Sequence, residues 1–402
     1  MSRINIALLS YEYPPNINGG LGRYIEHYTQ YLIKKNHHLW VFTYNAGNLP
    51  EEEHETQLAV YRPLRKVLIR LIKRYSLFCY NYDSYRIIKK LRQQTQFEVI
   101  CVHDWMSCPA GILCGLKLKI PVVFHVHNTE HSMTSWGKKN LLQSRISGIF
   151  ERFMARLAAQ IIVPSDKMYQ LLVNHGWDPE KIRIIHHGYD AAPYQNQDAQ
   201  TKLKIESGLR EKLHVHPDDK VLLFVGRLTY AKGIFYLIQA LKTVVQAKPN
   251  TKLIIVGAGL NKTVSKMNSL IRQLGLTENI YAYQQFLNQE QVFENYSVAD
   301  ICIFPSLYEP FGLVALEAMS LAKPVILGDG FPALFGGTPG NSTALFVKSD
   351  DPLQIAAGIL TLLEDSARAA RMGTAAQSFV RNNFNWDDTF NETLRVYRQA
   401  VN

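Results

Sequence analysis

Ten short apolar runs, rich in Ile, Val and Phe, recur along the chain, and segments with helical spacing separate them. Strands that alternate with helices form parallel sheets, and their continuous apolar character indicates that helices cover both faces. The predicted strands are Ile4–Leu9, Leu39–Thr43, Val99–Val102, Val122–Val126, Ile161–Val163, Ile182–Ile185, Val221–Val225, Leu253–Val256, Ile301–Phe304 and Val325–Leu327. Ten such strands, in a chain of 402 residues, are too many for one compact core. We therefore predict an α/β fold with two doubly wound, Rossmann-like domains.

A polar stretch without periodicity separates the sixth and seventh predicted strands, between Asp190 and Lys220. Segments of this kind often connect domains. We therefore predict an N-terminal domain at residues 1–195 and a C-terminal domain at residues 215–384. The segment from Trp386 onward is predicted to form a helix.

Two carboxylates flank a predicted helix start within residues 304–319. Glu309 lies in the turn, where Pro310 cannot donate a backbone hydrogen bond, and Glu317 lies about one turn into the helix. The free N–H groups at a helix start attract anions, so three residues are candidates for binding a phosphate. These candidates are Phe311, Gly312 and Leu313. Either glutamate taken alone is also explained by the helix dipole.

The first strand of the second predicted domain ends in a turn that carries two cations, Arg227 and Lys232. Ligands of open parallel sheets bind beyond the carboxyl ends of the strands, where this turn lies. A diphosphate leaving group gains negative charge as its bond to a sugar breaks, and fixed cations stabilise that charge. Arg offers a bidentate fork and Lys a point charge. The pair is a candidate diphosphate site, and a solvated surface pair is the alternative.

Three strand ends in the N-terminal half carry candidate ligand-binding residues. The first strand is followed by a glycine-rich turn that includes Gly20, where backbone amides can approach a phosphate or a sugar hydroxyl. The third strand ends in a His-Asp-Trp sequence that begins at His103. The fourth ends with His125 and His127, which share a face because alternate residues of a strand do. An ordinary strand-to-helix turn and satisfied core histidines are the alternatives.

The composition argues against a secreted, a membrane-spanning and a metal-binding protein. The apolar run near the N-terminus is too short for a signal peptide, and no run approaches the roughly 20 residues of a membrane span. The five cysteines show no C-x-x-C pair and suit reduced thiols, so we expect a cytoplasmic protein. The chain has no Asp-x-Asp sequence and no His/Cys cluster at zinc spacing. We therefore predict no metal site and no cofactor.

Most of the formal net charge of +10 comes from one segment. Between Thr56 and Thr95, ten Lys or Arg residues stand against the single Asp83. Residues 61–75 combine apolar residues at helical spacing with a basic face that includes Arg62. Such a helix suits peripheral attachment to the anionic inner face of a membrane, or else it packs on the core with a solvated basic face. Nucleic acid is not an expected partner, because no nucleic-acid module accompanies the charge.

Together these motifs resemble those of the retaining glycosyltransferases of family four, which have the GT-B fold and include glycogen and starch synthases. The matching segments are the Glu-Pro-Phe-Gly-Leu sequence with its second Glu, the Gly-Arg-Leu and Lys-Gly turn, the His-Asp-Trp sequence, and the glycine turn at Gly257. The resemblance covers both domains and implies that the helix at about 385–402 packs back on the first one.

The resemblance also implies individual roles. Arg227 and Lys232 are expected to bind the diphosphate, and Glu317 the ribose. Glu309 is expected to contact the sugar hydroxyls, and His127 the sugar. Gly20 is expected to offer its amide near the phosphate or the acceptor, and Gly257 to border the base and ribose. The chain departs from the family pattern at three positions. His187 stands where Asn is usual, Gln284 where Gly is usual, and Ala333 where an acid is usual.

We therefore predict a metal-independent retaining hexosyltransferase that uses a nucleotide diphosphate sugar and a hydroxyl acceptor, either lipid-linked or near a membrane. One alternative is a glucan synthase that uses ADP-glucose, although those enzymes carry Lys where this chain has Ile17. The other is a non-catalytic adaptor that binds a sugar nucleotide.

Overall fold

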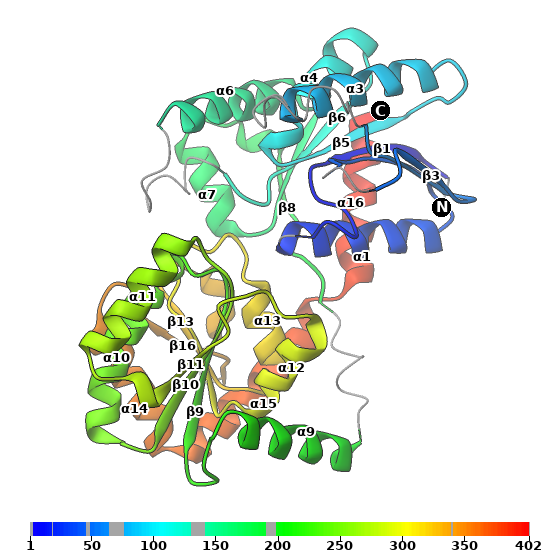
Figure 1. Ribbon diagram of the computed structural model, residues 1–402. Helices are drawn as coiled ribbons and strands as arrows, with labels where there is room; N and C mark the ends of the chain where they lie inside the picture. The colour runs from blue at the N-terminus through cyan, green and yellow to red at the C-terminus, as the bar shows by residue number, and fades with distance from the viewer. Residues whose placement is uncertain are drawn as a thin grey trace. The chain divides into compact units, whose positions relative to one another are not determined.

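The computed structural model describes residues 3–17, 19–45, 49–63, 76–129, 141–189, 198–338 and 341–401. The chain divides into two compact units, one made of Met1–Gly188 and Trp386–Asn402 and the other of Tyr189–Asn385. Each unit contains a mainly parallel sheet with helices on both faces (Figure 1). The predicted α/β class with two doubly wound domains is confirmed. The division falls between Gly188 and Tyr189, ahead of the region predicted to connect the domains.

The sheet of the first unit has eight strands in the order β3-β4-β2-β1-β5-β6-β7-β8. Neighbouring strands are parallel except β3 and β4, which are antiparallel. The strands are β1 Asn5–Ser10, β2 His38–Phe42, β3 Glu52–His54, β4 Leu58–Tyr61, β5 Val99–His103, β6 Val122–His125, β7 Gln160–Val163 and β8 Ile182–Ile184. Strand order reverses between β1 and β5, so their carboxyl ends flank the place where such sheets bind ligands.

The C-terminal helix α16 belongs to the first unit, where it contacts α1, β5, β6 and β7. Its apolar face enters the core through Phe390, Leu394 and Tyr397. Gly188 touches the start of α16, because a Cβ there would lie 2.7 Å from the Trp386 Cα. Figure 1 shows α1 and α16 on one face of the sheet and α3, α4 and α6 on the other. The helices are α1 Gly20–Lys34, α3 Ser76–Leu91, α4 Cys108–Leu113, α6 Leu141–Leu157, α7 Asp166–Asn174 and α16 Trp386–Val401.

The sheet of the second unit is parallel and has six strands in the order β11-β10-β9-β12-β13-β16. Its order reverses between β9 and β12, which makes their carboxyl ends the expected ligand edge. The strands are β9 Lys220–Val225, β10 Thr251–Val256, β11 Ile280–Ala282, β12 Ile301–Phe304, β13 Val325–Gly328 and β16 Leu345–Val347, with a separate hairpin of β14 Gly337–Thr338 and β15 Asn341–Ser342. Apolar clusters cover both faces of this sheet.

Side-chain caps define where several helices of the second unit begin. Asn288 and Gln291 form a capping box at α12, and Asp351 and Asp365 accept backbone N–H bonds at α14 and α15. The helices are α9 Ala199–Lys212, α10 Ile234–Ala247, α11 Asn261–Gln273, α12 Gln289–Val298, α13 Leu313–Ser320, α14 Pro352–Glu364 and α15 Ser366–Asn383. In Figure 1, α10, α11 and α14 lie on one face of the sheet and α12, α13 and α15 on the other.

All ten predicted strands are present, and the sequence patterns missed the short strands β3, β4, β11, β14, β15 and β16. β3, β11 and β16 lie at sheet edges, β4 lies next to the edge strand β3, and β14 and β15 form the small hairpin; each has only two to four residues. Short apolar runs such as Leu58–Tyr61 and Leu345–Val347 do not by themselves distinguish a strand from part of a helix.

The prediction for the basic helix was wrong at its start. Tyr61 ends β4, and Arg62 is only 2% exposed, with an ion pair of 2.9 Å to Glu53 and a hydrogen bond to the Pro14 carbonyl. Arg62 therefore belongs to the folded interior and not to a solvated basic face. The rest of the predicted helix, residues 64–75, lies outside the described residues. Among the helices that the structure describes, none is long and apolar enough to cross a bilayer.

Candidate active site

The loops after β9 and β12 meet at the ligand edge of the second unit. Lys232, in the turn after β9, donates a hydrogen bond of 2.5 Å from its Nζ to Oε2 of Glu309, which follows β12. The two side chains are only 18% and 10% exposed. This is an ion pair shielded from water, and its cation lies at the predicted place for a diphosphate.

Main-chain contacts hold Glu309 in position. Its N–H donates to the Gly330 carbonyl at 3.1 Å, and Ser306 Oγ lies 3.5 Å from the carboxylate oxygen that pairs with Lys232. A Cβ on Gly330 would lie 1.9 Å from the Ser306 carbonyl oxygen. The loop after β13 therefore supports the loop that carries Glu309.

Glu317 lies in α13 and accepts a hydrogen bond of 2.9 Å from the Tyr296 hydroxyl. Burial, reinforced by the Glu317 charge, raises the pKa of Tyr296 well above its usual value. The phenol therefore stays protonated and acts as the donor. This contact holds the Glu317 carboxylate on the partly exposed side of α13.

The glycine turns after β9 and β10 lie against each other. Gly257 has a φ of +158°, and a Cβ there would lie 1.8 Å from the Gly226 carbonyl oxygen. Gly226 N–H donates to the Val256 carbonyl, and Leu228 N–H to that of Ala258. Only glycine allows this approach, which brings Gly257 next to the turn that carries the exposed Arg227.

The residues at the start of α13 divide into main-chain and packing roles. The Phe311 side chain is 3% exposed and packs against Phe335 and Phe384, so only its backbone is left to meet a ligand. Gly312 has a φ of +112°, and a Cβ there would lie 2.5 Å from the Phe331 ring. Leu313 is half-buried against the core. The sequence could not separate these roles, because the aromatic cluster forms only in the folded unit.

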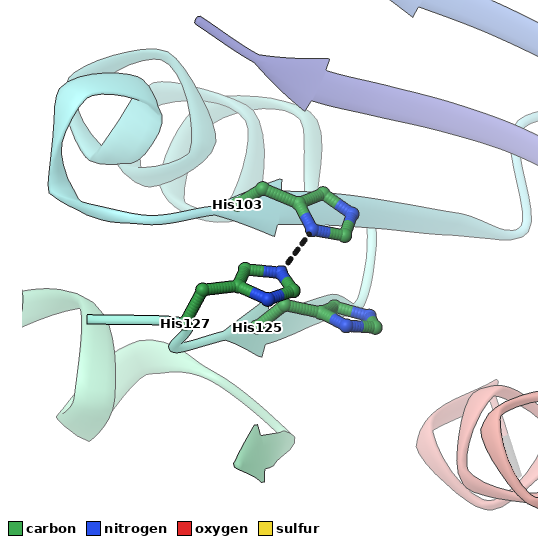
Figure 2. Close-up of side chains that lie close together, drawn as sticks. All are labelled: His103, His125 and His127. Carbon is green, nitrogen blue, oxygen red and sulfur yellow. Dashed lines mark hydrogen bonds between the residues drawn. The ribbon is translucent and has the colours of Figure 1, made fainter. Parts of the chain in front are cut away.

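In the first unit, four histidines gather beyond the carboxyl ends of the sheet. His127 contacts two others through its ring nitrogens: Nε2 lies 3.0 Å from His103 Nδ1, and Nδ1 lies 3.2 Å from His187 Nε2. The His125 Nε2 lies 2.7 Å from the Tyr397 hydroxyl. Figure 2 shows the His103–His127 bond and the neighbouring His125. Both ring nitrogens of His127 are thus engaged with other histidines.

Asp104 holds the backbone of this histidine group in place. Its carboxylate accepts hydrogen bonds from the main-chain N–H groups of His127 and Asn128, at 2.7 Å and 3.2 Å. Tyr24 of α1 packs beside His127 and His187, with ring centroids 4.7 Å and 4.5 Å away. Gly20, at the exposed start of the same helix, belongs to this unit as well. Sequence reasoning missed Tyr24 and the contact with His187, because both arise only when distant segments pack together.

Burial keeps the clustered histidines neutral. It lowers the pKa of His127 from 6.5 to about 3, and it lowers the pKa of His103, His125 and His187 well below the usual value, with their mutual repulsion adding to the effect in those three. Neutral imidazoles each have one N–H and one lone pair, which suits a chain of ring-to-ring hydrogen bonds.

We expect the protein to lose stability as pH falls from 6.5 toward 3, because these histidines bind protons in the unfolded chain before they do in the folded one. The folded-state pKa is depressed, so the stability is fully present above pH 6.5. Each such histidine costs up to about 1.4 kcal/mol per pH unit in that window. Urea unfolding between pH 7 and pH 4 measures how the free energy of unfolding changes with pH. His125→Gln should reduce this slope, and the exposed control His175→Gln should leave it unchanged. Equal slopes in all three proteins would contradict this account.

Two family models match the chain. The model described as Glycosyltransferase Family 4 matches residues 18–192, and the model described as Glycosyl transferases group 1 matches residues 207–379. The first match lies in the first unit except for its last four residues, and the second lies within the second unit.

Several known proteins are similar over most of the chain. An uncharacterised glycosyltransferase of Methanocaldococcus jannaschii is 29% identical over 99% of both chains. A glycogen synthase of Mycobacterium tuberculosis is 26% identical over 99% of this chain and 95% of its own. A D-inositol 3-phosphate glycosyltransferase of Corynebacterium efficiens is 31% identical over 76% of this chain and 72% of its own.

Solved structures share the fold. Sucrose-phosphate synthase from Thermosynechococcus elongatus matches with a TM-score of 0.80 and 24% identity over 99% of both chains. HepE of Anabaena, solved with UDP-glucose, matches with a TM-score of 0.76 and 19% identity over 98% of this chain and all of its own.

Two doubly wound units with ligand edges of this kind are the architecture of GT-B enzymes that use nucleotide sugars. The chain belongs to glycosyltransferase family four, so it is a retaining hexosyltransferase that transfers a sugar from a nucleotide sugar. The family predicted from the sequence motifs is confirmed.

Proposed function

We propose that this enzyme moves a hexosyl unit from a nucleotide diphosphate sugar to a hydroxyl acceptor, without a metal ion, and that Arg227 and Lys232 bind the diphosphate. The shielded Lys232–Glu309 pair carries the proposal. It lies where strand order reverses between β9 and β12, the place where doubly wound sheets bind nucleotides.

The ion pair suggests how donor binding prepares the reaction. When a diphosphate arrives, Lys232 turns from the Glu309 carboxylate to the phosphate oxygens, and the carboxylate becomes free to accept from the sugar hydroxyls. The bond between the anomeric carbon and the phosphate oxygen then breaks while the acceptor oxygen bonds to the same face of that carbon. The acceptor proton passes to the leaving phosphate, so no protein nucleophile is required. Arg227 and Lys232 stabilise the charge that develops on the diphosphate.

On the sugar, we propose that His127 acts through a ring nitrogen. Its backbone is anchored by Asp104, and among the described residues its ring nitrogens bond to other histidines. Exchange of a neutral imidazole partner for a sugar hydroxyl leaves no charge unpaired, so the exchange costs little.

The nucleotide and the role of Glu317 can be tested together by thermal shift with a panel of UDP-, GDP- and ADP-sugars, because ligand binding stabilises the folded state by RT ln(1 + [L]/Kd). The HepE structure with UDP-glucose makes UDP-glucose the first donor to try. Glu317→Ala should weaken donor binding roughly 10–100-fold, the effect of losing about 1.5–3 kcal/mol from a charged hydrogen bond. The exposed control Glu364→Ala should bind normally. No stabilisation of the unaltered protein by any sugar nucleotide would contradict the donor assignment.

A glucan synthase activity is the second candidate, and the similarity to a glycogen synthase over nearly the whole chain favours it. Ile17 in place of the usual Lys speaks against it. Glycogen elongation with ADP-glucose decides between them: incorporation of glucose would establish the synthase, and its absence would exclude it.

Attachment to an anionic membrane remains a further part of the proposal. It is supported by the local excess of Lys and Arg between residues 56 and 95. Flotation with anionic liposomes tests it, with neutral liposomes as the control. Recovery in the soluble fraction in both cases would exclude attachment.

A further inference from the structure

We propose that the outer side of helix α6 lies on the surface of an anionic membrane. This surface, the α6 face, is defined by six exposed side chains of the helix, which are Arg145, Ile146, Ile149, Arg152, Phe153 and Arg156. The inference rests on the membrane attachment proposed above, and it assigns that attachment to a surface that the sequence patterns did not indicate.

The apolar side chains of the α6 face form one row. Ile146, Ile149 and Phe153 are three and four positions apart, so they project to the same side of the helix. They are 44%, 57% and 44% exposed. Single exposed apolar residues are ordinary on a protein surface, whereas several that adjoin mark a surface for binding. The row therefore indicates that a partner covers this side of α6.

The opposite side of α6 holds the helix in the fold. Ser147, Glu151 and Met154 are buried there. A Cβ on Gly111 of α4 would lie 2.8 Å from the Met154 methyl group, so the two helices pack closely. The helix is thus fixed by its inner side, and the α6 face is not required for packing within the first unit.

Three arginines border the apolar row. Arg145, Arg152 and Arg156 are seven and four positions apart and are exposed. The one acid of α6, Glu151, is only 4% exposed and lies on the opposite side. A guanidinium group binds phosphate through two parallel hydrogen bonds, and apolar side chains beside it enter the boundary between headgroups and acyl chains. Anionic lipid therefore complements both halves of the α6 face.

Helix α3 repeats this combination nearby. Both α3 and α6 contact α4, and all three helices lie on the same face of the sheet (Figure 1). Phe78 and Tyr82 of α3 are 66% and 41% exposed, and their rings stack with centroids 6.1 Å apart. The exposed Arg86 and Lys89 follow on the same side of α3. One layer of helices thus presents apolar and basic side chains twice, which suits a broad lipid surface.

A second copy of the chain would match the α6 face less well. A two-fold contact places the same surface of both copies together. The arginines of both copies would then gather in one interface, and α6 has no exposed acid to pair with them. An anionic bilayer supplies the negative charge that such a contact lacks.

The test is flotation of the full-length protein at low ionic strength with vesicles of phosphatidylcholine and phosphatidylserine, compared with phosphatidylcholine alone. The unaltered protein should float with the anionic vesicles. Ile149→Asp/Phe153→Asp should lower its partition coefficient roughly 100-fold, because two apolar side chains no longer leave water. Arg145→Gln/Arg152→Gln/Arg156→Gln should also lower it roughly 100-fold, since each basic residue near the surface contributes about fivefold.

Matched controls place the same changes on the second unit. Leu353→Asp alters an apolar side chain that is 70% exposed, and Lys262→Gln/Arg371→Gln/Arg381→Gln removes three exposed cations. Both controls should float like the unaltered protein. Circular dichroism confirms that every variant is folded, and thermal shift with sugar nucleotides should be the same in all of them.

The outcomes separate this inference from the proposals on which it depends. If the unaltered protein floats and both α6 variants float equally well, the α6 face is not the contact, although membrane attachment stands. If the unaltered protein does not float, attachment and the α6 face fail together, while thermal shift still reports on the donor site. A dimer in sedimentation that Ile149→Asp/Phe153→Asp converts to a monomer would show that a second copy covers the α6 face, and would overturn the inference.

Discussion

Replacing Arg227 and Lys232 together with alanine is expected to lower kcat/KM by roughly 10²–10⁴-fold, because two charged hydrogen bonds to the diphosphate, each worth about 1.5–3 kcal/mol, are lost. The loss should fall mainly on kcat, since the diphosphate gains charge as the glycosidic bond breaks. Release of nucleoside diphosphate from the best donor of the panel, measured under steady-state conditions, gives both constants.

The matched control replaces two exposed cations of the same unit, Lys262 and Arg371, with alanine. It alters the net charge equally but leaves the loop after β9 intact, so its activity should be unchanged. Lys232→Ala also leaves the Glu309 carboxylate without its cation, and Lys232→Ala/Glu309→Gln reveals how much of the effect comes from that unpaired charge. Full activity of the Arg227 and Lys232 double variant would refute their assignment.

Gly233→Ala is expected to destabilise the second unit by several kcal/mol and to displace Lys232. Gly233 has a φ of +71°, and a Cβ there would lie 1.9 Å from the Pro305 carbonyl oxygen. The left-handed conformation costs about 1–2 kcal/mol for any other residue. The clash adds about 1–3 kcal/mol or more, since backbone at the end of β12 must move. Urea unfolding measures the free energy, and donor-induced thermal shift measures the site.

Gly275→Ala separates these two contributions. Gly275 has nearly the same φ, +70°, but apart from its chain neighbours no atom of the described residues lies within 4 Å of a Cβ built there. Its substitution should therefore show the conformational cost alone and leave donor binding intact. If both variants lose the same stability, the close approach of the loops after β9 and β12 contributes nothing.

Most of the fold could be predicted, because the buried strands are continuous runs of apolar residues. All ten predicted strands are present, while the short strands β11 and β16 were missed. Arg62 shows a different failure. Its position in a basic run favoured a solvated helix, yet Glu53, on a strand paired with β4, draws it into the interior.

The sequence by itself determined the class of fold and the family, because strand-helix alternation and local motifs such as that from Glu309 to Glu317 need no distant partner. Tertiary structure alone decided which residues touch. Only the register of β5 and β6 places His103 opposite His125, and only the packing of α16 brings Tyr397 to His125 across 272 positions of the chain. Likewise the Lys232–Glu309 pair joins residues 77 positions apart. Such contacts depend on the order of strands in a sheet and on which helices pack against it. Local periodicity of the sequence does not encode either of these.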